Sequence, residues 1–190
     1  MPNTNKFGKR YQIIAFATKG EKPRLFNRLR INPPLPANYK YDRPKGMYVT
    51  DVWDDIRELT SGYYAGEEPL RNADGSRFHK QQSPMQLLLR ILLSSSMPGD
   101  WVLDPFAGTG TTLVVARQLG RYAIGIEKSE ANAECIHKRL DFPRKADDIE
   151  PYYQDYRYTN HLDQIWGKAA LPNTEWSQTL QPSLLSADHP

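Results

Sequence analysis

Two acidic residues, with a glycine-rich turn close behind the first, form the clearest chemical pattern in this sequence. The stretch Asp104-Pro-Phe-Ala-Gly-Thr-Gly-Thr-Thr112 contains Gly108 and Gly110, and Glu127 follows 23 positions after its first residue. Glycines let the backbone approach a ligand closely, and the free N–H groups at the start of a following helix favour an anion. An acid at this spacing accepts hydrogen bonds from ribose hydroxyls. The pattern predicts a nucleoside-binding half-site.

The same residues discriminate between nucleoside ligands. The dinucleotide-binding fingerprint needs a third glycine for close helix–strand packing, and Leu113 stands at that place. A phosphate-binding P-loop needs Gly-Lys-Ser or Gly-Lys-Thr, which the turn lacks. An acid shortly before the glycines suits a positive ammonium group and repels a pyrophosphate. S-adenosylmethionine has both a cationic amino acid end and a ribose, so we predict it as the cofactor. A glycine turn without any ligand is the alternative.

An alternation of strands and helices must position these residues. Apolar runs at 101–104 and 122–126 predict strands, and helices are predicted at 111–119 and 130–140. Before them, the pair Ser83-Pro84 predicts a hydroxyl N-cap and the first residue of another apolar helix. This order favours a parallel sheet with covering helices.

The glycine stretch resembles motif I of the DNA amino-methyltransferases, which methylate N6 of adenine or N4 of cytosine. Upstream, His79-Lys-Gln-Gln-Ser-Pro84 and the apolar helix after it are similar to motif X of that family. In the permuted β group of the family, motif X precedes motif I, as it does here. The resemblance covers about residues 8 to 142. It implies a Rossmann-like α/β sheet with flanking helices that depends on S-adenosylmethionine.

The resemblance also implies a role for each matched residue. Asp104 would face the methionine ammonium group, Glu127 would hold the ribose hydroxyls, and Gln82 with Ser83 would close over the methionine end. The turn itself would wrap the cofactor through Pro105, Phe106, Ala107, Gly108, Thr109, Gly110, Thr111 and Thr112. Two positions depart from motif X: Lys80 replaces its proline and Ser83 replaces its lysine. The second change removes a positive charge.

The catalytic motif IV of the family has one candidate in this chain. That motif is Asp, Asn or Ser followed by Pro-Pro and an aromatic residue, and it binds the exocyclic amine while its ring stacks on the flipped base. The candidate is Asn32-Pro33-Pro34-Leu35. It lacks the aromatic ring, and it lies only 47 positions before His79, where the family has a whole strand-and-helix region. We therefore interpret it as a proline-rich loop.

The sequence contains too few strands for the seven-stranded sheet of the resembled fold. Even with a strand predicted from Tyr11 to Ala17, three or four are found. A half-sheet would leave an unpaired edge and an uncovered apolar face. We therefore expect the C-terminal, cofactor-binding portion of a methyltransferase, inactive alone, whose catalytic half belongs to a second polypeptide or is lost.

The predicted organisation has three parts. Residues 1–46 form a basic segment with one strand and a proline-rich loop. Residues 47–142 form the S-adenosylmethionine-binding region. Residues 143–190 are a polar, tyrosine-rich extension, disordered from about 171, whose tyrosines either pack on the domain or stack on bases.

Positive charge is concentrated near the N-terminus. Residues 1–46 hold 11 Lys or Arg and only two acids, although the formal net charge of the chain is +3. Clustered basic side chains release counterions from nucleic acid, so this segment is predicted to contact DNA, with a solvated surface as the alternative. The predicted DNA-contacting residues are Lys22, Arg24, Arg28 and Arg30.

Composition excludes several classes of protein. The single cysteine, Cys135, excludes an intrachain disulfide framework and a Cys-rich zinc site. No apolar run has the length of a membrane span, and the first residues lack a secretory signal. We expect a cytoplasmic, DNA-associated protein.

Three functions remain open at this stage. The first is site-specific transfer of a methyl group to adenine or cytosine in DNA. The second is a non-catalytic remnant or accessory subunit that binds cofactor, DNA or a partner chain. The third is methylation of RNA or of a small molecule, which a cofactor motif alone does not exclude.

Overall fold

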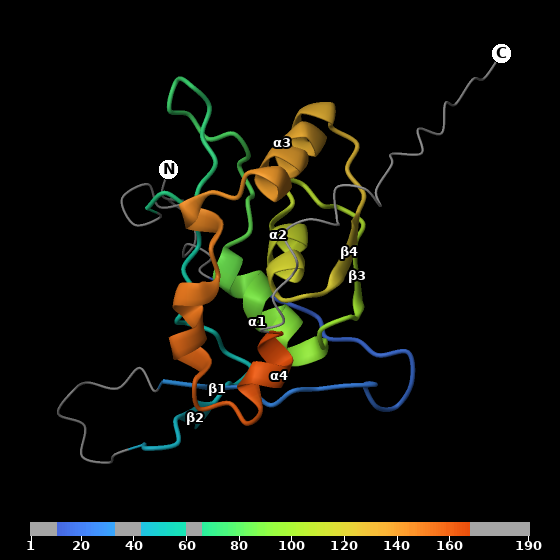
Figure 1. The fold of residues 1–190 in the computed structure, drawn as a ribbon, viewed down its shortest axis with the longest axis vertical. Coiled ribbons are helices and arrows are strands. Elements are labelled where there is room, and N and C mark those ends of the chain that lie inside the picture. The colour runs from blue at the N-terminus through green and yellow to red at the C-terminus, as the bar shows by residue number, and fades with distance from the viewer. Residues whose placement is uncertain (1–10, 33–42, 60–65, 168–190) are drawn as a thin grey trace, which may run out of the picture.

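The computed structural model describes residues 11–32, 43–59 and 66–167 of the chain. The described strands form one parallel pair and one antiparallel pair. Figure 1 shows the parallel pair beside the helices and the short antiparallel pair at the lower end. The strands are β1 (Arg30–Ile31), β2 (Met47–Tyr48), β3 (Trp101–Asp104) and β4 (Tyr122–Gly125). The helices are α1 (Met85–Ser95), α2 (Thr111–Gln118), α3 (Glu130–Asp141) and α4 (Leu162–Trp166). The 3-10 turns η1 (Lys145–Asp147) and η2 (Glu150–Tyr156) precede α4.

The parallel pair β3–β4 is the element that the cofactor pattern requires. Trp101 lies opposite Tyr122, and Asp104 lies opposite Gly125, so the carboxyl ends of both strands meet at one edge. Helix α2 connects the two strands and packs on both of them. The predicted strand–helix–strand–helix alternation is confirmed, and the described residues form a partial Rossmann-like α/β fold.

Local residues determine the end of α2 and the start of α3, whereas a residue distant in sequence caps the start of α1. Gly120, with φ 70°, follows the end of α2, and the hydroxyl of Ser129 accepts a hydrogen bond from Asn132 N at the start of α3. The predicted Ser83 cap of α1 is wrong. Pro84 is the N-cap residue, and the carboxylate of Glu68 accepts the hydrogen bond from Met85 N at 2.6 Å.

The strand predicted from Tyr11 to Ala17 is also wrong, because these residues are exposed and form no strand. A strand needs a neighbour for its N–H and C=O groups, and β propensity without one does not decide the conformation. Within the described part of the basic segment, the strand is β1 instead. It pairs antiparallel with β2, so that Arg30 lies opposite Tyr48 and Ile31 opposite Met47.

The tyrosine-rich extension packs on the core of the domain. Tyr156 in η2 is fully buried and accepts a hydrogen bond from Arg90 of α1 at 3.1 Å. Tyr153 contacts the buried Trp166 edge to face, with ring centroids 5.1 Å apart. These contacts favour packing over base stacking. The tail predicted to be disordered lies outside the described residues.

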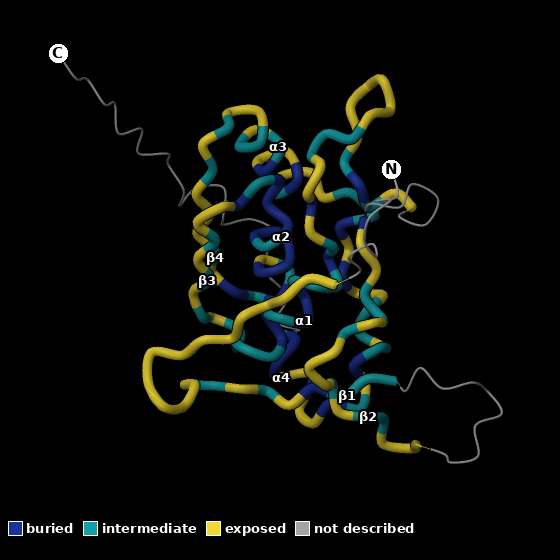
Figure 2. Tube along the Cα trace, turned by 180° about the vertical axis from the view of Figure 1, so that it is seen from behind, coloured by how far each residue is buried: buried dark blue, intermediate teal, exposed yellow. Residues whose placement is uncertain are grey.

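Side chains of α1 and α2 form most of the core. Met85, Leu89 and Leu93 of α1 are fully buried against Val115 of α2 and Leu119 after it. Figure 2 shows both helices in the buried interior of the trace. The packing of apolar helix faces, rather than the two short strand pairs, therefore holds the described residues together.

In the part of the chain that the structure describes, one face of β3–β4 is exposed. Val102 and Ala123 point to the side where the core lies, whereas Trp101, Leu103 and Ile124 are 69%, 62% and 49% exposed. Figure 2 shows exposed positions along both strands, and Trp101 stacks on Tyr122 at 4.9 Å. The uncovered apolar face expected of a half-sheet is confirmed.

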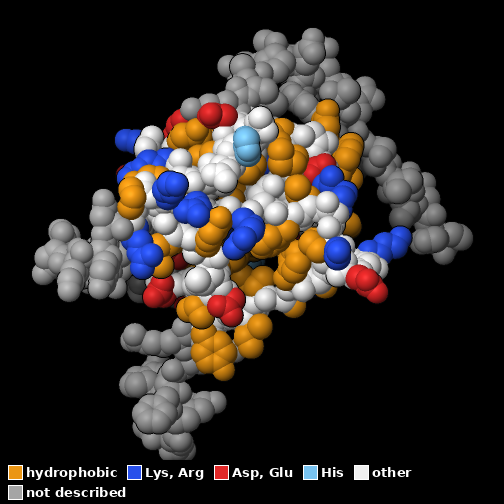
Figure 3. All heavy atoms as spheres, turned by 90° about the horizontal axis from the view of Figure 1, so that it is seen from below, with side chains coloured by type: hydrophobic (Ala, Val, Ile, Leu, Met, Phe, Trp, Pro, Cys, Tyr) orange, Lys and Arg blue, Asp and Glu red, His pale blue; other side chains and the backbone are white. Residues whose placement is uncertain are grey.

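Basic side chains gather at the end of the molecule that holds β1 and β2. Figure 3, which views that end from below, shows Lys and Arg among hydrophobic side chains. Arg28 and Arg30 lie over the ring of Tyr48, with 4.2 and 4.0 Å from each guanidinium carbon to the ring centroid. Arg24 instead forms an ion pair with Asp100 at 2.5 Å. Among the described residues, no helix is long and apolar enough to cross a membrane.

Candidate cofactor site

The glycine turn follows the end of β3 and is held to the end of β4 by one carboxylate. Glu127 Oε2 accepts a hydrogen bond from Gly108 N, and Oε1 accepts one from Ser129 N, both at 2.8 Å. The Ser129 N–H is the largest cause that lowers the pKa of Glu127, with burial opposing it and the Gly108 N–H adding to it. Asp104 Oδ1 accepts a hydrogen bond from Phe106 N at 3.1 Å. The two predicted acids therefore lie at the carboxyl ends of neighbouring strands.

Gly108 and Gly110 have different surroundings. Both have positive φ, 54° and 79°, a region that L side chains rarely adopt. A Cβ on Gly108 would meet only the Phe106 carbonyl oxygen, at 3.8 Å, so this position borders open space. A Cβ on Gly110 would lie 2.7 Å from Cγ1 of Ile136 in α3. Close packing of the turn on α3 therefore requires Gly110 whether or not a ligand binds.

The turn has an open side and a buried side. Phe106 is 88% exposed, whereas Ala107 and Thr109 are buried. Gly110 is the N-cap residue of α2, and no side chain caps that helix end. The remaining predicted positions are Pro105 (exposed), Thr111 (buried) and Thr112 (half-buried). An open backbone surface beside an uncapped helix N-terminus is suited to a ligand with an anionic group.

Arg139 of α3 supports the turn from its buried side. Its Nη1 donates to the Thr109 carbonyl oxygen at 2.7 Å and to Thr111 Oγ1 at 3.3 Å. Its side chain is only 2% exposed and forms an ion pair with the fully buried Asp147 of η1 at 2.7 Å. This residue was missed at the sequence level. The available signal was an arginine three residues after Ile136, on the apolar stripe of α3.

Asp147 also forms an ion pair with a second arginine, Arg144. Arg144 Nη2 donates to Asp147 Oδ1 at 2.7 Å, and its Nε donates to Oδ2 at 2.9 Å. Burial alone would raise the pKa of Asp147, but the hydrogen bonds from Arg144 and Arg139 outweigh it and lower that pKa. Asp147 is thus an ionised acceptor between two cations.

The segment similar to motif X is tied to the loop before it. Gln82 is buried, its Oε1 accepts from Leu70 N at 2.8 Å, and its Nε2 donates to the Glu68 carbonyl oxygen at 3.1 Å. Burial raises the pKa of the Glu68 carboxyl, against the opposing hydrogen bond from Met85 N. Ser83 is exposed. The side chain of Gln82 therefore fixes its own loop.

The structure does not bring Asn32 to the glycine turn. Asn32 directly follows β1, and its N–H donates to the Asp155 carbonyl oxygen in η2 at 3.2 Å. The turn packs on α3, which Figure 1 places at the other end of the molecule from β1. Pro33 and Pro34 lie outside the described residues.

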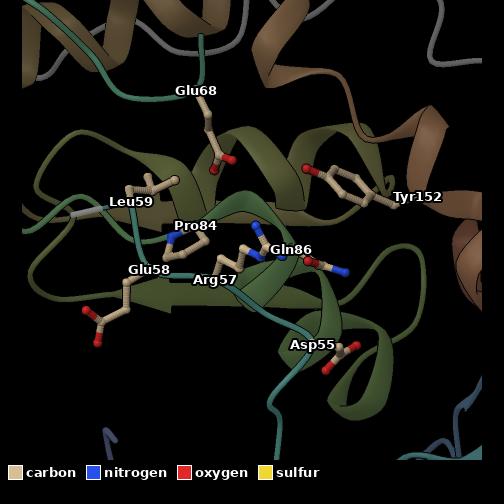
Figure 4. Close-up of a pocket in the computed structure, with 8 residues that line it drawn as sticks. All are labelled: Asp55, Arg57, Glu58, Leu59, Glu68, Pro84, Gln86 and Tyr152. Atoms are coloured by element: carbon tan, nitrogen blue, oxygen red, sulfur yellow. The ribbon is translucent and has the colours of Figure 1, made fainter. Parts of the chain in front are cut away.

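Two cavities lie near the site but do not include the turn. One, of about 160 Å³, lies beside the start of α1. Figure 4 shows that Glu68 points toward the first turn of that helix and that Tyr152 approaches from η2. A second, of about 470 Å³, lies between α3 and the segment that contains Leu70 and Phe78. Residues 104–112 line neither cavity, so the open side of the turn faces solvent. The described residues contain no cluster of His, Cys, Asp and Glu that could hold a metal ion.

Comparison with known proteins assigns this chain to a family. A family model described as DNA methylase matches residues 1–138. The chain belongs to this family. This match confirms the predicted resemblance to the DNA amino-methyltransferases. It does not distinguish the adenine type from the cytosine type.

This DNA methylase chain is similar to longer curated relatives. It is 45% identical over 86 residues to the type II methyltransferase M.HinfI of Haemophilus influenzae, covering 45% of this chain and 24% of that protein. It is 34% identical over 153 residues to the type II methyltransferase M.BamHI of Bacillus amyloliquefaciens, covering 74% of this chain and 33% of that protein. The chain thus spans about a quarter to a third of the length of these relatives.

Solved structures of similar sequence cover a smaller part of the methylase chain. The M1.HpyAVI–SAM complex is 35% identical, covers 34% of each chain and has a TM-score of 0.32. TTHA0409 of Thermus thermophilus, a putative DNA modification methylase complexed with S-adenosyl-L-methionine, is 45% identical, with 30% of this chain and 24% of that chain covered and a TM-score of 0.30.

Proposed function

We propose that this chain is the S-adenosylmethionine-binding portion of a DNA methyltransferase whose acceptor is an exocyclic amine of adenine or cytosine. The observation that carries the proposal is the Glu127 carboxylate beside the open glycine turn, at the carboxyl ends of two parallel strands. Ligands of open α/β sheets bind at this edge. Similar methylases whose structures are complexes with S-adenosylmethionine support the choice of cofactor.

The Glu127 carboxylate has unused hydrogen-bond acceptor sites that could bind the ribose. An ionised carboxylate has about four lone-pair sites. The N–H groups of Gly108 and Ser129 use one site on each oxygen. One further site on each oxygen can accept a ribose hydroxyl, so the same carboxylate would hold the turn and the cofactor together.

The other predicted positions would serve the methionine end. Asp104 would attract the ammonium group, while the open surface at Gly108 lets the backbone approach the cofactor. The cofactor supplies the sulfonium methyl group when bound. The contribution of these residues to the reaction is then to hold that group in a fixed place for the amine.

We further propose that polypeptide other than these 190 residues supplies the amine-binding motif and the remaining strands. The uncovered face at Trp101, Leu103 and Ile124 supports this, because an apolar sheet face of this kind is normally covered. Asn32 stands away from the turn, so it does not replace the motif. The alternative is a remnant or accessory subunit that keeps cofactor binding without catalysis.

The cofactor assignment is tested by a cycle that combines one substitution with one cofactor change. Hydrogen bonds to a charged acceptor are worth roughly 1.5–3 kcal/mol, so Glu127→Ala is expected to weaken binding about ten- to a hundredfold in calorimetry. A 2′-deoxy cofactor analogue should lose affinity for the parent chain and little more for the variant. Glu130→Ala, an exposed acid on the first turn of α3, is the matched control and should bind as the parent does. If the two losses simply add, Glu127 does not contact the ribose.

The incomplete catalytic machinery is tested by adding the missing part. DNA and labelled cofactor are incubated with this chain, with and without a co-expressed fragment that contains Asp/Asn/Ser-Pro-Pro-Tyr. Methyl transfer is expected only with both pieces. Robust transfer by the chain alone would make Asn32-Pro33-Pro34 catalytic and would overturn the proposal of a separate catalytic half.

A further inference from the structure

A buried ion cluster joins the two segments that flank the proposed cofactor site. The cluster consists of Arg139 in α3, Asp147 in η1 and Arg144 before η1. Their side chains are 2%, 0% and 30% exposed. The two segments are the glycine turn, 105–112, and the loop 67–85 that ends in the residues similar to motif X. The segments are distant in sequence, and this cluster is what connects them through side chains.

The first half of the connection reaches the glycine turn. Arg139 Nη1 donates to the Thr109 carbonyl oxygen, and Arg139 Nη2 donates to Asp147 at 2.7 Å. Because the guanidinium is planar, a single orientation serves both partners. The position of Thr109, between the two glycines, is therefore set by the position of Asp147.

The second half of the connection reaches the loop. Arg144 Nη2 donates to Asp147 at 2.7 Å and to the Glu68 carbonyl oxygen at 3.0 Å, while Nη1 donates to the Glu67 carbonyl oxygen at 3.3 Å. The same Glu68 carbonyl accepts from Gln82, and the Glu68 carboxylate accepts from Met85 N. Asp147 thereby fixes the loop and the start of α1.

We infer that Asp147 and its two arginines are positioning residues for the cofactor site: they set the glycine turn at a fixed distance from the loop that, by its resemblance to motif X, is expected to close over the methionine end. Stability alone does not explain the cluster. An apolar pair of similar volume is often as stable as a buried ion pair or more so, because removing the charges from water is costly. An apolar pair could fill the space but could not donate to the Thr109 carbonyl. The inference rests on the proposed function for the identity of the ligand and on the resemblance to motif X for the role of the loop.

The first experiment needs no ligand. In hydrogen exchange on the parent and on Asp147→Asn, peptides covering 107–113 and 67–72 are expected to exchange about tenfold faster together in the variant, the consequence of losing one hydrogen bond to a charged group. Peptides from α4 should be unchanged. Faster exchange in one segment alone, or a uniform increase over the whole chain, would overturn the inference.

The second experiment separates positioning from folding. Arg139→Met/Asp147→Leu replaces the charged pair by an apolar one, and Ile165→Ala in α4 is a destabilised control remote from the cluster. Thermal unfolding should show recovered stability in the double variant relative to Asp147→Asn. Its affinity for S-adenosylhomocysteine should stay about tenfold below that of the parent, because Thr109 has lost its donor. Ile165→Ala should bind within about twofold of the parent.

The outcomes distinguish the two proposals. Affinity that recovers together with stability, or an equal loss in Ile165→Ala, shows a merely structural cluster and overturns the inference. A parent chain that binds no cofactor contradicts the proposed function instead, and hydrogen exchange still decides whether the cluster couples the two segments.

Discussion

Gly108 and Gly110 meet different surroundings although both adopt left-handed backbone angles. At Gly110 a methyl group would lie 2.7 Å from Ile136, in the packed interior between the turn and α3. At Gly108 the same group would meet open space. At the scale of single residues, Gly110 therefore serves packing, and Gly108 is left to serve the ligand.

These surroundings predict opposite effects for two identical substitutions. Gly110→Ala is expected to lower the free energy of unfolding by roughly 2–4 kcal/mol, from overpacking and backbone strain together. Gly108→Ala should cost only about 1–2 kcal/mol of backbone strain, yet it should abolish most cofactor binding. Thermal unfolding and calorimetry on both variants measure this. Equal destabilisation with unchanged affinity at Gly108 would contradict a ligand at the open side of the turn.

Asp55 predicts how stability depends on pH. Its carboxylate pairs with Arg90, whose side chain is 1% exposed, and the hydrogen bond from Arg90 lowers the pKa of Asp55 despite burial. A carboxyl group with a lowered folded pKa stabilises the protein above its unfolded pKa and loses that contribution as pH falls through the folded value. The unfolded pKa of Asp is about 3.9, so this contribution should be lost below roughly pH 4.

Asp55→Asn isolates that contribution. The variant is expected to be about 1–3 kcal/mol less stable at neutral pH, because the buried Arg90 loses its charged acceptor. The difference from the parent should shrink as pH falls below about 4. Chemical denaturation at several pH values measures it, with the exposed neighbour Asp54→Asn as the control. A difference that does not depend on pH would exclude Asp55 as the titrating partner of Arg90.

At the scale of elements, the pair β3–β4 is covered on one side only. Leu103 and Ile124 are on the exposed face, and Val102 is on the face that contacts the core. Substitutions at exposed positions typically change stability by about 0.5 kcal/mol or less. The two faces should therefore respond differently to the same kind of change.

Leu103→Ser and Ile124→Ser are expected to leave the stability of the chain nearly unchanged but to weaken association with a fragment that supplies the catalytic motif. Val102→Ser, the matched control on the core side, should destabilise the chain by about 1–3 kcal/mol. Thermal unfolding and sedimentation of mixtures measure the two effects. Were Leu103→Ser as destabilising as Val102→Ser, its side chain would already be covered within this chain.

The start of α1 shows why an element can be predicted while its end is not. The apolar run from Met85 indicates the helix, and the structure confirms a helix there, although it begins one residue later than predicted, at Met85 instead of Pro84. The cap comes from Glu68, 17 residues earlier, which a local rule at Ser83 does not consider. The free N–H groups at the start of a helix can donate to any acceptor that the fold brings near them.

At the scale of the whole molecule, charge is distributed unevenly, and the structure separates the four predicted DNA-contacting cations. Arg28 and Arg30 share the exposed ring of Tyr48, whereas Arg24 is paired with Asp100. A cation already neutralised by an acid releases fewer counterions on binding a phosphate. Arg28 and Arg30 should therefore contribute more to nonspecific DNA affinity than Arg24.

This difference is measurable as a salt dependence. Each phosphate contact contributes roughly −0.9 to the slope of log K against log salt, so Arg28→Gln/Arg30→Gln should flatten the slope by up to about 1.8. Arg24→Gln should change it less, and Lys138→Gln, on α3 beside Glu134, is the control. Titrations of duplex DNA at several salt concentrations measure it. An unchanged slope in the double variant would show that these residues form a solvated surface and do not contact DNA phosphates.

The sequence by itself determined the elements whose signals lie within a few consecutive residues. The glycines of the turn, the acid after the second strand and the alternation of strands with helices indicate β3, α2, β4 and α3, together with the family. Those signals are local: a left-handed turn needs glycine, and a strand or helix has its own period of apolar side chains.

Only the tertiary structure decided the features that depend on partners distant in the chain. Tyr11 to Ala17 has the composition of a strand, yet these residues are exposed and form no strand. Arg139 lies on the apolar stripe of α3, but the sequence does not reveal that Asp147 is the acceptor that lets it be buried there. A backbone N–H or a charged side chain is stable away from water only when another group meets it, and sequence distance does not reveal that group. The support of the cofactor turn therefore depends on which distant segments the fold brings together.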